Sequence, residues 1–215
     1  MREILKNLYG ITDKSLDEKE FAFLENKFGT IPGKLREFYS ISGCSGKIQN
    51  GQDDWITPVH YKNWKWLNDE ENLFVLHENQ GVCHAVILKE DLGKDDPPVY
   101  IVDDNLENPL LCAAGTEEFI KAALVYEAVF QFDYSSESFY YISDDEFEIL
   151  KEKLDFMPYH LENWLFTDVM LFRYLSDGAA FVMGSEDNYQ MCFGAASKET
   201  FDKLSSVLDS IGEEM

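Results

Sequence analysis

The segment FVLHENQGVCHAVIL, residues 74–88, places the polar turn ENQG between two apolar runs. Apolar runs separated by a Gln-Gly step are typical of a β-hairpin, since Gly81 tolerates the positive φ that a tight turn needs. Asn79 and Gln80 suit the same turn because their side chains bond to nearby backbone groups. The stretch therefore predicts two antiparallel strands, and its polar residues need no catalytic role to explain them.

Two helices are predicted before this hairpin. In the first, Ser15 and Glu18 form a capping box and Gly29 supplies the left-handed end. In the second, Pro32 suits the first turn and Gly43 ends the helix. Apolar residues recur at helical spacing in both, at Phe21, Leu24 and Phe28 and then at Leu35, Phe38 and Tyr39.

Strands and a helix are also predicted directly after the hairpin. Short strands are expected at residues 97–104 and 109–114, each beginning with proline, which suits strand starts and edges. The helix covers residues 115–130, with Thr116 as N-cap and two glutamates in the positively polarised first turn. Its apolar face comprises Phe119, Ala122, Ala123, Tyr126 and Phe130.

The last third of the chain repeats this alternation of strands and helices. Ser143 and Glu146 open a helix by the capping-box pattern, and Pro158 lies beyond its end. Strand-like segments follow at residues 164–175, 179–184 and 189–196. A final helix is indicated by the in-line apolar residues Phe201, Leu204, Leu208 and Ile211.

Tight turns rather than helical crossovers join the predicted strands, which favours an α+β fold. We expect a mostly antiparallel central sheet flanked by helices. Residues 1–133 form the main domain in this prediction, and residues 134–215 form a strand–helix extension that continues the same sheet and core. Residues 44–71 lack clear periodicity and are expected to form a long, structured loop.

The composition and net charge limit the kinds of partner that the protein can bind. Of the 215 residues, 45% are hydrophobic, enough to bury a substantial core. The chain carries 18 Lys and Arg against 41 Asp and Glu, for a net charge of −23. Phosphate backbones are bound by clustered basic residues, so nucleic acid is a poor candidate ligand. An acidic exterior attracts cationic partners, although acidity that serves only solubility is the alternative.

The absence of recognisable targeting signals and the pattern of cysteines predict a cytoplasmic protein. The first residues carry charges and no apolar core of signal-peptide length, and no apolar run reaches the roughly 18 residues that a membrane span needs. Cys44, Cys83, Cys112 and Cys192 are widely spaced and form no CxxC pair. We expect reduced thiols, no membrane contact and a soluble protein.

Catalytic and metal-binding patterns are weak. Cys44 follows a predicted helix C-terminus, where the helix dipole favours the protonated thiol over a nucleophilic thiolate. Cys83 and His84 are adjacent in a predicted strand, so their side chains point to opposite faces and cannot both reach one ion. Adjacent acids lie beside turns and caps, where they are solvated. We expect no catalytic residue, metal or cofactor; a thiol or carboxylate hydrolase whose residues converge only in the fold is the alternative.

The best candidate for a contact surface is the aromatic and acidic segment that begins at residue 53. Trp and Tyr supply large anchors at interface centres, and acids around them pair with cationic groups. The hairpin turn presents further hydrogen-bonding groups beside them. As the alternative, the aromatic residues only seal a long loop onto the sheet. The predicted contact residues are Asp53, Asp54, Trp55, Tyr61, Trp64, Trp66, Glu78 and Gln80.

The order of motifs between residues 15 and 133 is distinctive. The helix IPGKLREFYSISG is followed by an aromatic loop, the hairpin described above, the strand PPVYIV and the helix TEEFIKAALVY. This order resembles the SUKH superfamily, whose members carry an Ile/Leu-Pro-x-x-Leu-x-x-Phe/Tyr helix ending in glycine, an Asn- or Gln-Gly hairpin, a Pro-Val-Tyr-like strand and a helix bearing a Phe. The matching residues are Ile31, Pro32, Leu35, Phe38, Tyr39, Gly43, Asn79, Gln80, Gly81, Pro98, Val99, Tyr100, Phe119 and Ile120.

The resemblance implies an α+β fold and a role in protein binding. Most bacterial members are immunity proteins that neutralise secreted toxins, frequently nucleases, and eukaryotic relatives are regulatory interaction domains. With the acidic composition, this implies a cytoplasmic immunity protein that binds a basic toxin by stoichiometric occlusion. A regulatory scaffold domain that binds a partner neither basic nor toxic is the alternative. Both a monomer and a homodimer are compatible with the sequence.

Overall fold

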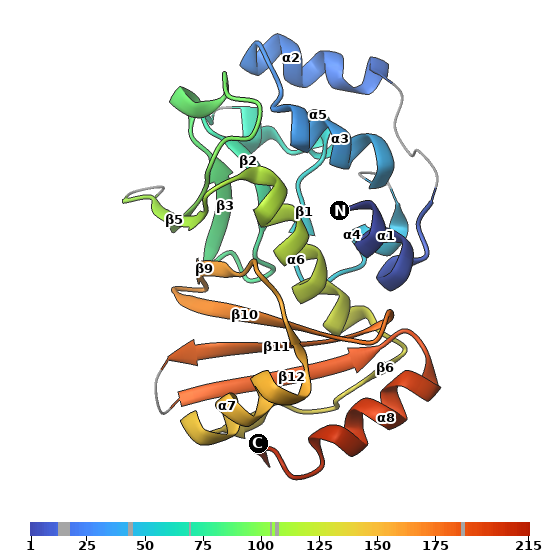
Figure 1. Cartoon of the computed structure of the whole chain (residues 1–215). Helices are drawn as coiled ribbons and strands as arrows, with labels where there is room; N and C mark the ends of the chain where they lie inside the picture. The colour runs from blue at the N-terminus through green and yellow to red at the C-terminus, as the bar shows by residue number, and fades with distance from the viewer. Residues whose placement is uncertain (13–17, 43–44, 69, 104, 106–107, 186–187) are drawn as a thin grey trace.

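A computed structural model of the chain is shown in Figure 1; it describes residues 1–12, 18–42, 45–68, 70–103, 105, 108–185 and 188–215. The fold is α+β with two antiparallel sheets, so the predicted fold class is confirmed. The helix α6, Thr116–Gln131, lies between the two sheets near the centre of the molecule (Figure 1).

The first sheet comprises β1 (Asp54–Trp55), β2 (Leu73–His77), β3 (Cys83–Ile87), β4 (Val99–Asp103) and β5 (Leu110–Ala113), which lie side by side in chain order. The predicted hairpin is β2–β3, and its register places His77 opposite His84. Gly81 has a φ of 76° in the turn, a conformation that a residue with a Cβ adopts only under strain. The ENQG turn therefore has the conformation that its composition predicts.

The second sheet comprises β6 (Tyr134–Ser135), β7 (Tyr140–Ile142), β8 (Asp155–Phe156), β9 (Leu161–Trp164), β10 (Thr167–Tyr174), β11 (Gly178–Ser185), β12 (Asn188–Ala195) and β13 (Glu213–Glu214). The strand order is β13-β7-β12-β11-β10-β8, with β6 paired to β12 and β9 paired to β10. The expectation that residues 134–215 continue the first sheet therefore differs from the structure, where these residues form a sheet of their own. The reason is that α6 covers one face of the first sheet, and the later strands pack on the opposite side of that helix.

Burial of α6 on nearly all sides joins the two sheets into one core. The sequence predicts a single apolar face, but Ile120, Leu124 and Val129, which lie off that face, are also buried. A helix between two sheets has to be apolar around most of its circumference. Phe181 of β11 shows the contact, because its ring lies 4.9 Å from that of Tyr126.

The second sheet is covered on both faces. Along β11, Ala179 and Phe181 belong to the core around α6, whereas Ala180 and Val182 belong to a separate apolar cluster on the other face. Two helices cover this other face, α7 (Asp144–Lys153) and α8 (Lys198–Leu208). The period-two alternation of strand side chains therefore supplies both cores at once.

Short helices occupy the N-terminal part of the chain. They are α1 (Arg2–Tyr9), η1 (Glu18–Phe21), α2 (Ala22–Phe28), α3 (Gly33–Ser42), α4 (Gly46–Gln49), α5 (Pro58–Asn63) and η2 (Lys65–Asn68), with η3 (Lys89–Asp91) after the hairpin. The prediction of a loop over residues 44–71 is wrong, since α4, β1, α5 and η2 fall within it. These elements are two to six residues long, too short to repeat an apolar spacing.

Helix ends were predicted with mixed success. The capping box of Ser143 and Glu146 is present at the start of α7, and Gly29 ends α2 with a φ of 79°. Thr116, however, is the first helical residue of α6 and its hydroxyl donates to the carbonyl of Pro97. The carboxylate of Asp96 accepts from the Glu117 backbone instead. Ser15 and Gly43 lie outside the described residues.

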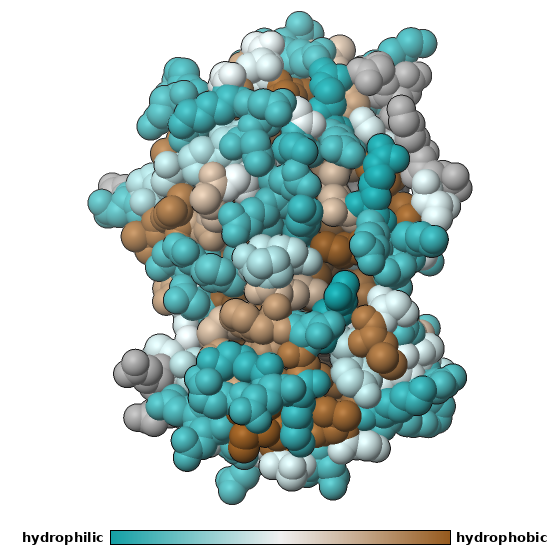
Figure 2. All heavy atoms as spheres, viewed as in Figure 1, coloured by the Kyte–Doolittle hydropathy of each residue, from teal (hydrophilic) through white to brown (hydrophobic). Residues whose placement is uncertain are grey.

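The outer strand of the first sheet contacts the second sheet. Asn163, at the end of β9, donates from its side chain to the carbonyl oxygen of Leu111 in β5, 2.8 Å away. The β9–β10 hairpin thus lies against β5. Figure 2 shows a mainly hydrophilic surface with apolar atoms at the β5 side, where Leu110 and Leu111 are exposed.

Replacement of Phe181 by alanine tests whether both sheets depend on α6. Because Phe181 is fully buried between β11 and α6, Phe181→Ala should lower the free energy of unfolding by about 3–5 kcal/mol in urea titrations. Circular dichroism and tryptophan fluorescence should report one shared transition. Ile149→Ala, at an exposed position of α7, is the control and should change stability by less than about 0.5 kcal/mol. Two separate transitions, with only one of them shifted, would contradict a shared core.

Candidate partner-binding surface

The predicted contact residues around β1 divide between two faces of the strand. Asp53 and Trp55 point into the molecule and are 2% and 0% exposed, whereas Asp54 between them is half-buried and lies opposite His77 of β2. Successive side chains of a strand point to opposite faces, which explains the division. Asp53 and Trp55 are therefore not contact residues, and that part of the prediction is wrong.

Two of the predicted aromatic anchors belong to the core. Trp55 packs against Phe38, with ring centroids 4.6 Å apart. Tyr61 is fully buried, and its hydroxyl accepts a hydrogen bond from the backbone of Phe74 at 2.7 Å. The alternative that aromatic residues seal this segment onto the sheet is correct for these two residues.

The carboxylate of Glu78 stabilises the hairpin turn from within. Glu78 is 5% exposed, and its Oε2 accepts hydrogen bonds from the backbone of Gln80 at 2.9 Å and of Val82 at 3.0 Å. Asp53 accepts from the backbone of Asn79 at the same turn. Glu78 is thus a structural residue, and the prediction that it contacts a partner is wrong. Gln80 is exposed, as a contact residue must be.

Three of the remaining predicted residues, Asp54, Trp64 and Trp66, lie on one surface together with His77, which was not predicted. The rings of Trp64 and Trp66 are stacked with centroids 6.1 Å apart, and both pack against His77. Asp54 lies opposite His77 in the strand register, on the same face of the sheet. We call these four residues, Asp54, Trp64, Trp66 and His77, the Trp66 surface.

Trp66 combines exposure with fixed packing. Its side chain is 40% exposed, although rings surround it on the other sides. Phe74 lies edge-on at 5.2 Å and His84 lies at 6.1 Å, both on the sheet beneath. An exposed indole held in this way loses little conformational entropy on contact with a partner.

A histidine pair lies beneath Trp66. The Nδ1 atoms of His77 and His84 are 2.7 Å apart, and the two rings are parallel within 8°. A hydrogen bond between ring nitrogens requires that one of them carries no proton. Sequence reasoning missed this pair, although the signal was present, since a hairpin centred on ENQG brings the residues on either side of the turn together.

Two carboxyl groups share a buried site between β1 and α6. Glu127 is fully buried, and its Oε2 accepts from the Asp53 backbone at 3.2 Å. Among the described residues, Asp53 Oδ2 and Glu127 Oε1 have no hydrogen-bond partner, and burial disfavours a charge on either group, so we infer that the pair shares one proton. Burial raises the pKa of Asp53 to about 6. Burial, together with the charge of Asp53, raises the pKa of Glu127 well above its ordinary value. Gly51 admits the pair, because a Cβ there would lie 2.2 Å from Glu127 Oε2.

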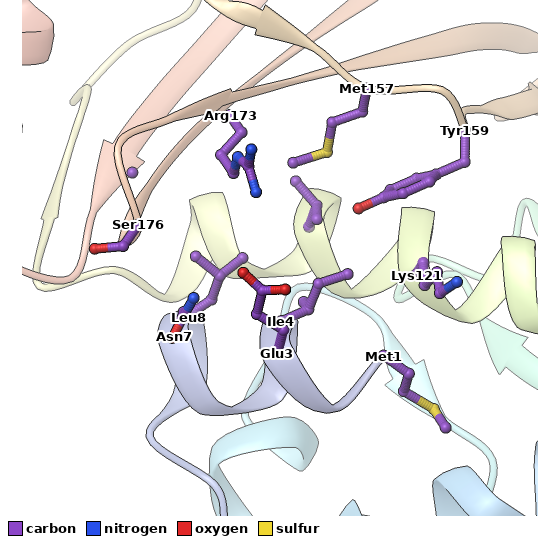
Figure 3. Close-up of a pocket in the computed structure, with 12 residues that line it drawn as sticks. Met1, Glu3, Ile4, Asn7, Leu8, Lys121, Met157, Tyr159, Arg173 and Ser176 are labelled. Carbon is purple, nitrogen blue, oxygen red and sulfur yellow. The ribbon is translucent and has the colours of Figure 1, made fainter.

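A cavity of about 230 Å³ lies between α1, α6 and the edge of the second sheet (Figure 3). Ile4, Leu8 and Met157 form its apolar part, and Tyr159 and Arg173 reach into it from the sheet side. Its basic side chains are already paired, Arg173 with Asp155 and Lys121 with Glu117. The volume is also below the roughly 300 Å³ at which ligand sites usually begin. The cavity therefore does not favour a small-molecule ligand.

The groups weighed for catalysis have structural surroundings. Asp96 caps α6 and Asp103 bonds to the Asn105 backbone. Cys83, Cys112 and Cys192 are buried, and burial raises the pKa of the Cys112 thiol well above its ordinary value. Cys44 lies outside the described residues. In the part of the chain that the structure describes, no three His, Cys, Asp or Glu side chains are grouped to hold a metal ion.

Comparison with known proteins adds no relative. No family model matches the chain, and no match was found among curated proteins or solved structures. Over the described ranges, no helix is both long and apolar enough to cross a membrane.

Replacement of Glu127 by glutamine tests the shared proton. Both pKa values are raised by folding, so the folded protein holds protons that the unfolded chain releases above about pH 4. The contribution of the pair to stability is therefore greatest in acid and is lost as pH rises through about 6. In Glu127→Gln, the amide can donate to Asp53 without a shared proton. Urea unfolding at pH 7.5 should show a gain on the order of 1–3 kcal/mol over the wild type, and a smaller gain at pH 5.

Glu152→Gln is the matched control, because Glu152 is exposed on α7 and loses the same charge. Its difference from the wild type should be the same at both pH values. An equal gain for Glu127→Gln at pH 5 and pH 7.5 would contradict the shared proton.

Proposed function

We propose that this protein binds a basic protein partner and that the Trp66 surface is the anchor. The observation that carries the proposal is the exposure of Trp66 in a fixed ring cluster beside Asp54. Buried tryptophans at interface centres contribute much of the binding energy in protein complexes, and a neighbouring acid selects a cationic counterpart.

The net charge supports a basic partner. A charge of −23 creates a field that raises the local concentration of cationic proteins and speeds their association. It also repels nucleic acid, whose backbone is an anion. A protein that itself binds nucleic acid is basic, so it fits this field well.

The resemblance to the SUKH superfamily gives the proposal its biological form. In that form the chain is a cytoplasmic immunity protein that occludes the active or substrate-binding face of a toxin, with acids in the place of nucleic-acid phosphates if the toxin is a nuclease. The resemblance rests on the residues quoted for it in the sequence. A regulatory domain with a partner that is not basic is the competing outcome of the tests.

Co-expression tests the proposal directly. The chain is produced together with the protein encoded by the adjacent gene, and growth and co-purification are scored. Rescue of growth together with a one-to-one complex supports capture. Rescue without a complex points to enzymatic detoxification, and a stable complex with an acidic, non-toxic protein favours the regulatory alternative.

Trp66→Ala should weaken that complex strongly. Loss of a central indole typically costs about 2 kcal/mol or more, so the Kd measured by calorimetry should rise by about 30-fold or more. Phe23→Ala is the control, since Phe23 on α2 is 37% exposed, close to the 40% of Trp66. It should change the Kd by less than about three-fold. Equal effects of the two substitutions would remove the Trp66 surface from the interface.

Salt should act on the rate of association. Between about 20 and 500 mM NaCl, the association rate constant should fall by at least about ten-fold, because screening removes the long-range attraction. Trp66→Ala should keep this salt dependence and raise mainly the dissociation rate constant. Surface plasmon resonance measures both. An association rate that does not change with salt would contradict steering by charge.

A further inference from the structure

A second surface, lined by acidic and aromatic side chains, lies away from Trp66 on the outer side of the second sheet. A hollow of about 420 Å³ opens there between α8, the segment that joins β6 to β7, and the C-terminal strand β13. Its charged and aromatic lining consists of Glu137, Tyr140, Phe193, Phe201, Asp209 and Glu214.

Aromatic rings form the floor of this hollow. The rings of Phe193 on β12 and Phe201 on α8 are stacked at 5.9 Å with an angle of 21°. Tyr140 on β7 packs against Phe193 at 5.6 Å. Because Phe193 is 5% exposed and its neighbours are half-buried, the rings are held in place from below. Ring faces of this kind attract cations through their quadrupole.

Carboxylates without cations surround the rings. No Lys, Arg or His lines the hollow, and among the residues that the structure describes no ion pair is found for Glu137, Asp209 or Glu214. The Glu214 side chain accepts a hydrogen bond from the Ser138 hydroxyl, at 2.9 Å. By contrast, the acids on the outward face of α8 are paired, Asp202 with Lys198 and Glu199 with Lys203. The unpaired acids of this helix region thus gather at the hollow.

The charge of the chain is concentrated in this part of the sequence. Residues 134–215 contain 5 Lys and Arg against 17 Asp and Glu, so 5 − 17 = −12 of the total charge of −23 belongs to them. The pKa of Tyr140 is raised above its ordinary value, mainly by burial and in addition by the negative charges of Glu214 and Glu137. This direction is the one expected beside a group of carboxylates.

We propose that this hollow receives an arginine side chain of the basic partner. The proposal rests on the proposed function and adds to it a second contact site and the residue type that it selects. A guanidinium group is planar, so it can lie against the half-buried rings of Tyr140 and Phe201 while its edge donates to the carboxylates around them. An anionic or purely apolar ligand would leave three carboxylates without a counter-charge.

The site can be tested without the partner. The probe is the peptide acetyl-Gly-Arg-Gly-amide, titrated into ¹⁵N-labelled protein and followed by NMR. The comparison peptide carries citrulline, which has nearly the shape of arginine and no charge. We expect saturable shifts of the amides of Phe193, Phe201 and Asp209 with the arginine peptide only. A lysine peptide should shift the same amides with weaker affinity, because an ammonium group does not stack on rings.

A pair of double substitutions separates the site from general acidity. Glu137→Gln with Asp209→Asn removes two charges at the hollow, and Glu199→Gln with Asp202→Asn removes two from the outward face of α8. The first should lower the affinity for the arginine peptide by roughly five-fold or more, and the second by less than about two-fold. An unchanged NMR spectrum elsewhere checks that both variants are folded. Equal losses in both variants, equal binding of the citrulline peptide, or shifts spread over all acidic surfaces would overturn the proposal.

Measurements with the basic partner distinguish this proposal from the proposed function. If Trp66→Ala weakens the complex and the double variant at the hollow does not, the partner is bound without the hollow. The arginine site is then wrong, whereas the proposed function stands. If the arginine peptide binds the hollow but no basic protein forms a complex, the proposed function fails and the site remains. Loss of partner affinity in the hollow variant supports both.

Discussion

Burial of α6 on almost its whole circumference is the constraint on which the rest of the structure depends. The first sheet packs on one side of the helix and the second sheet on the other, so neither sheet can keep its apolar face covered without it. Asp53 and Glu127 place a polar contact within this apolar setting, between β1 and the same helix. The helix thus holds the strand that carries Asp54, and with it one border of the Trp66 surface.

Local sequence signals predicted the parts of the fold that local physics determines. The ENQG turn, the helix of Leu35, Phe38 and Tyr39 and the capping box of Ser143 are all present, since each depends on residues within one or two turns of chain. The arrangement of residues 134–215 was not predictable in this way. An apolar helix surface permits a second sheet, but the choice between that sheet and an extension of the first depends on packing between distant segments.

The residue types of the segment predicted a contact surface, but the structure shows that only some of these residues are exposed. Trp64 and Trp66 lie on the surface, whereas Trp55 and Tyr61 belong to the core, and the same residue types therefore have opposite roles. Two residues of β1 do not suffice to reveal which of its side chains points inward. The burial of Glu127 was not predicted for a related reason. A single acid among apolar residues of a helix is expected to face solvent, unless both sides of the helix are known to be covered.

The hydrogen bond from Asn163 to Leu111 also limits how another chain can attach. A strand at the border of a sheet offers free amide and carbonyl groups on which a foreign strand can align, and proteins commonly protect such borders. Here the β9–β10 hairpin occupies that position beside β5. Recruitment by strand addition is therefore obstructed at this border, and so is the open-ended stacking of copies that leads to fibres.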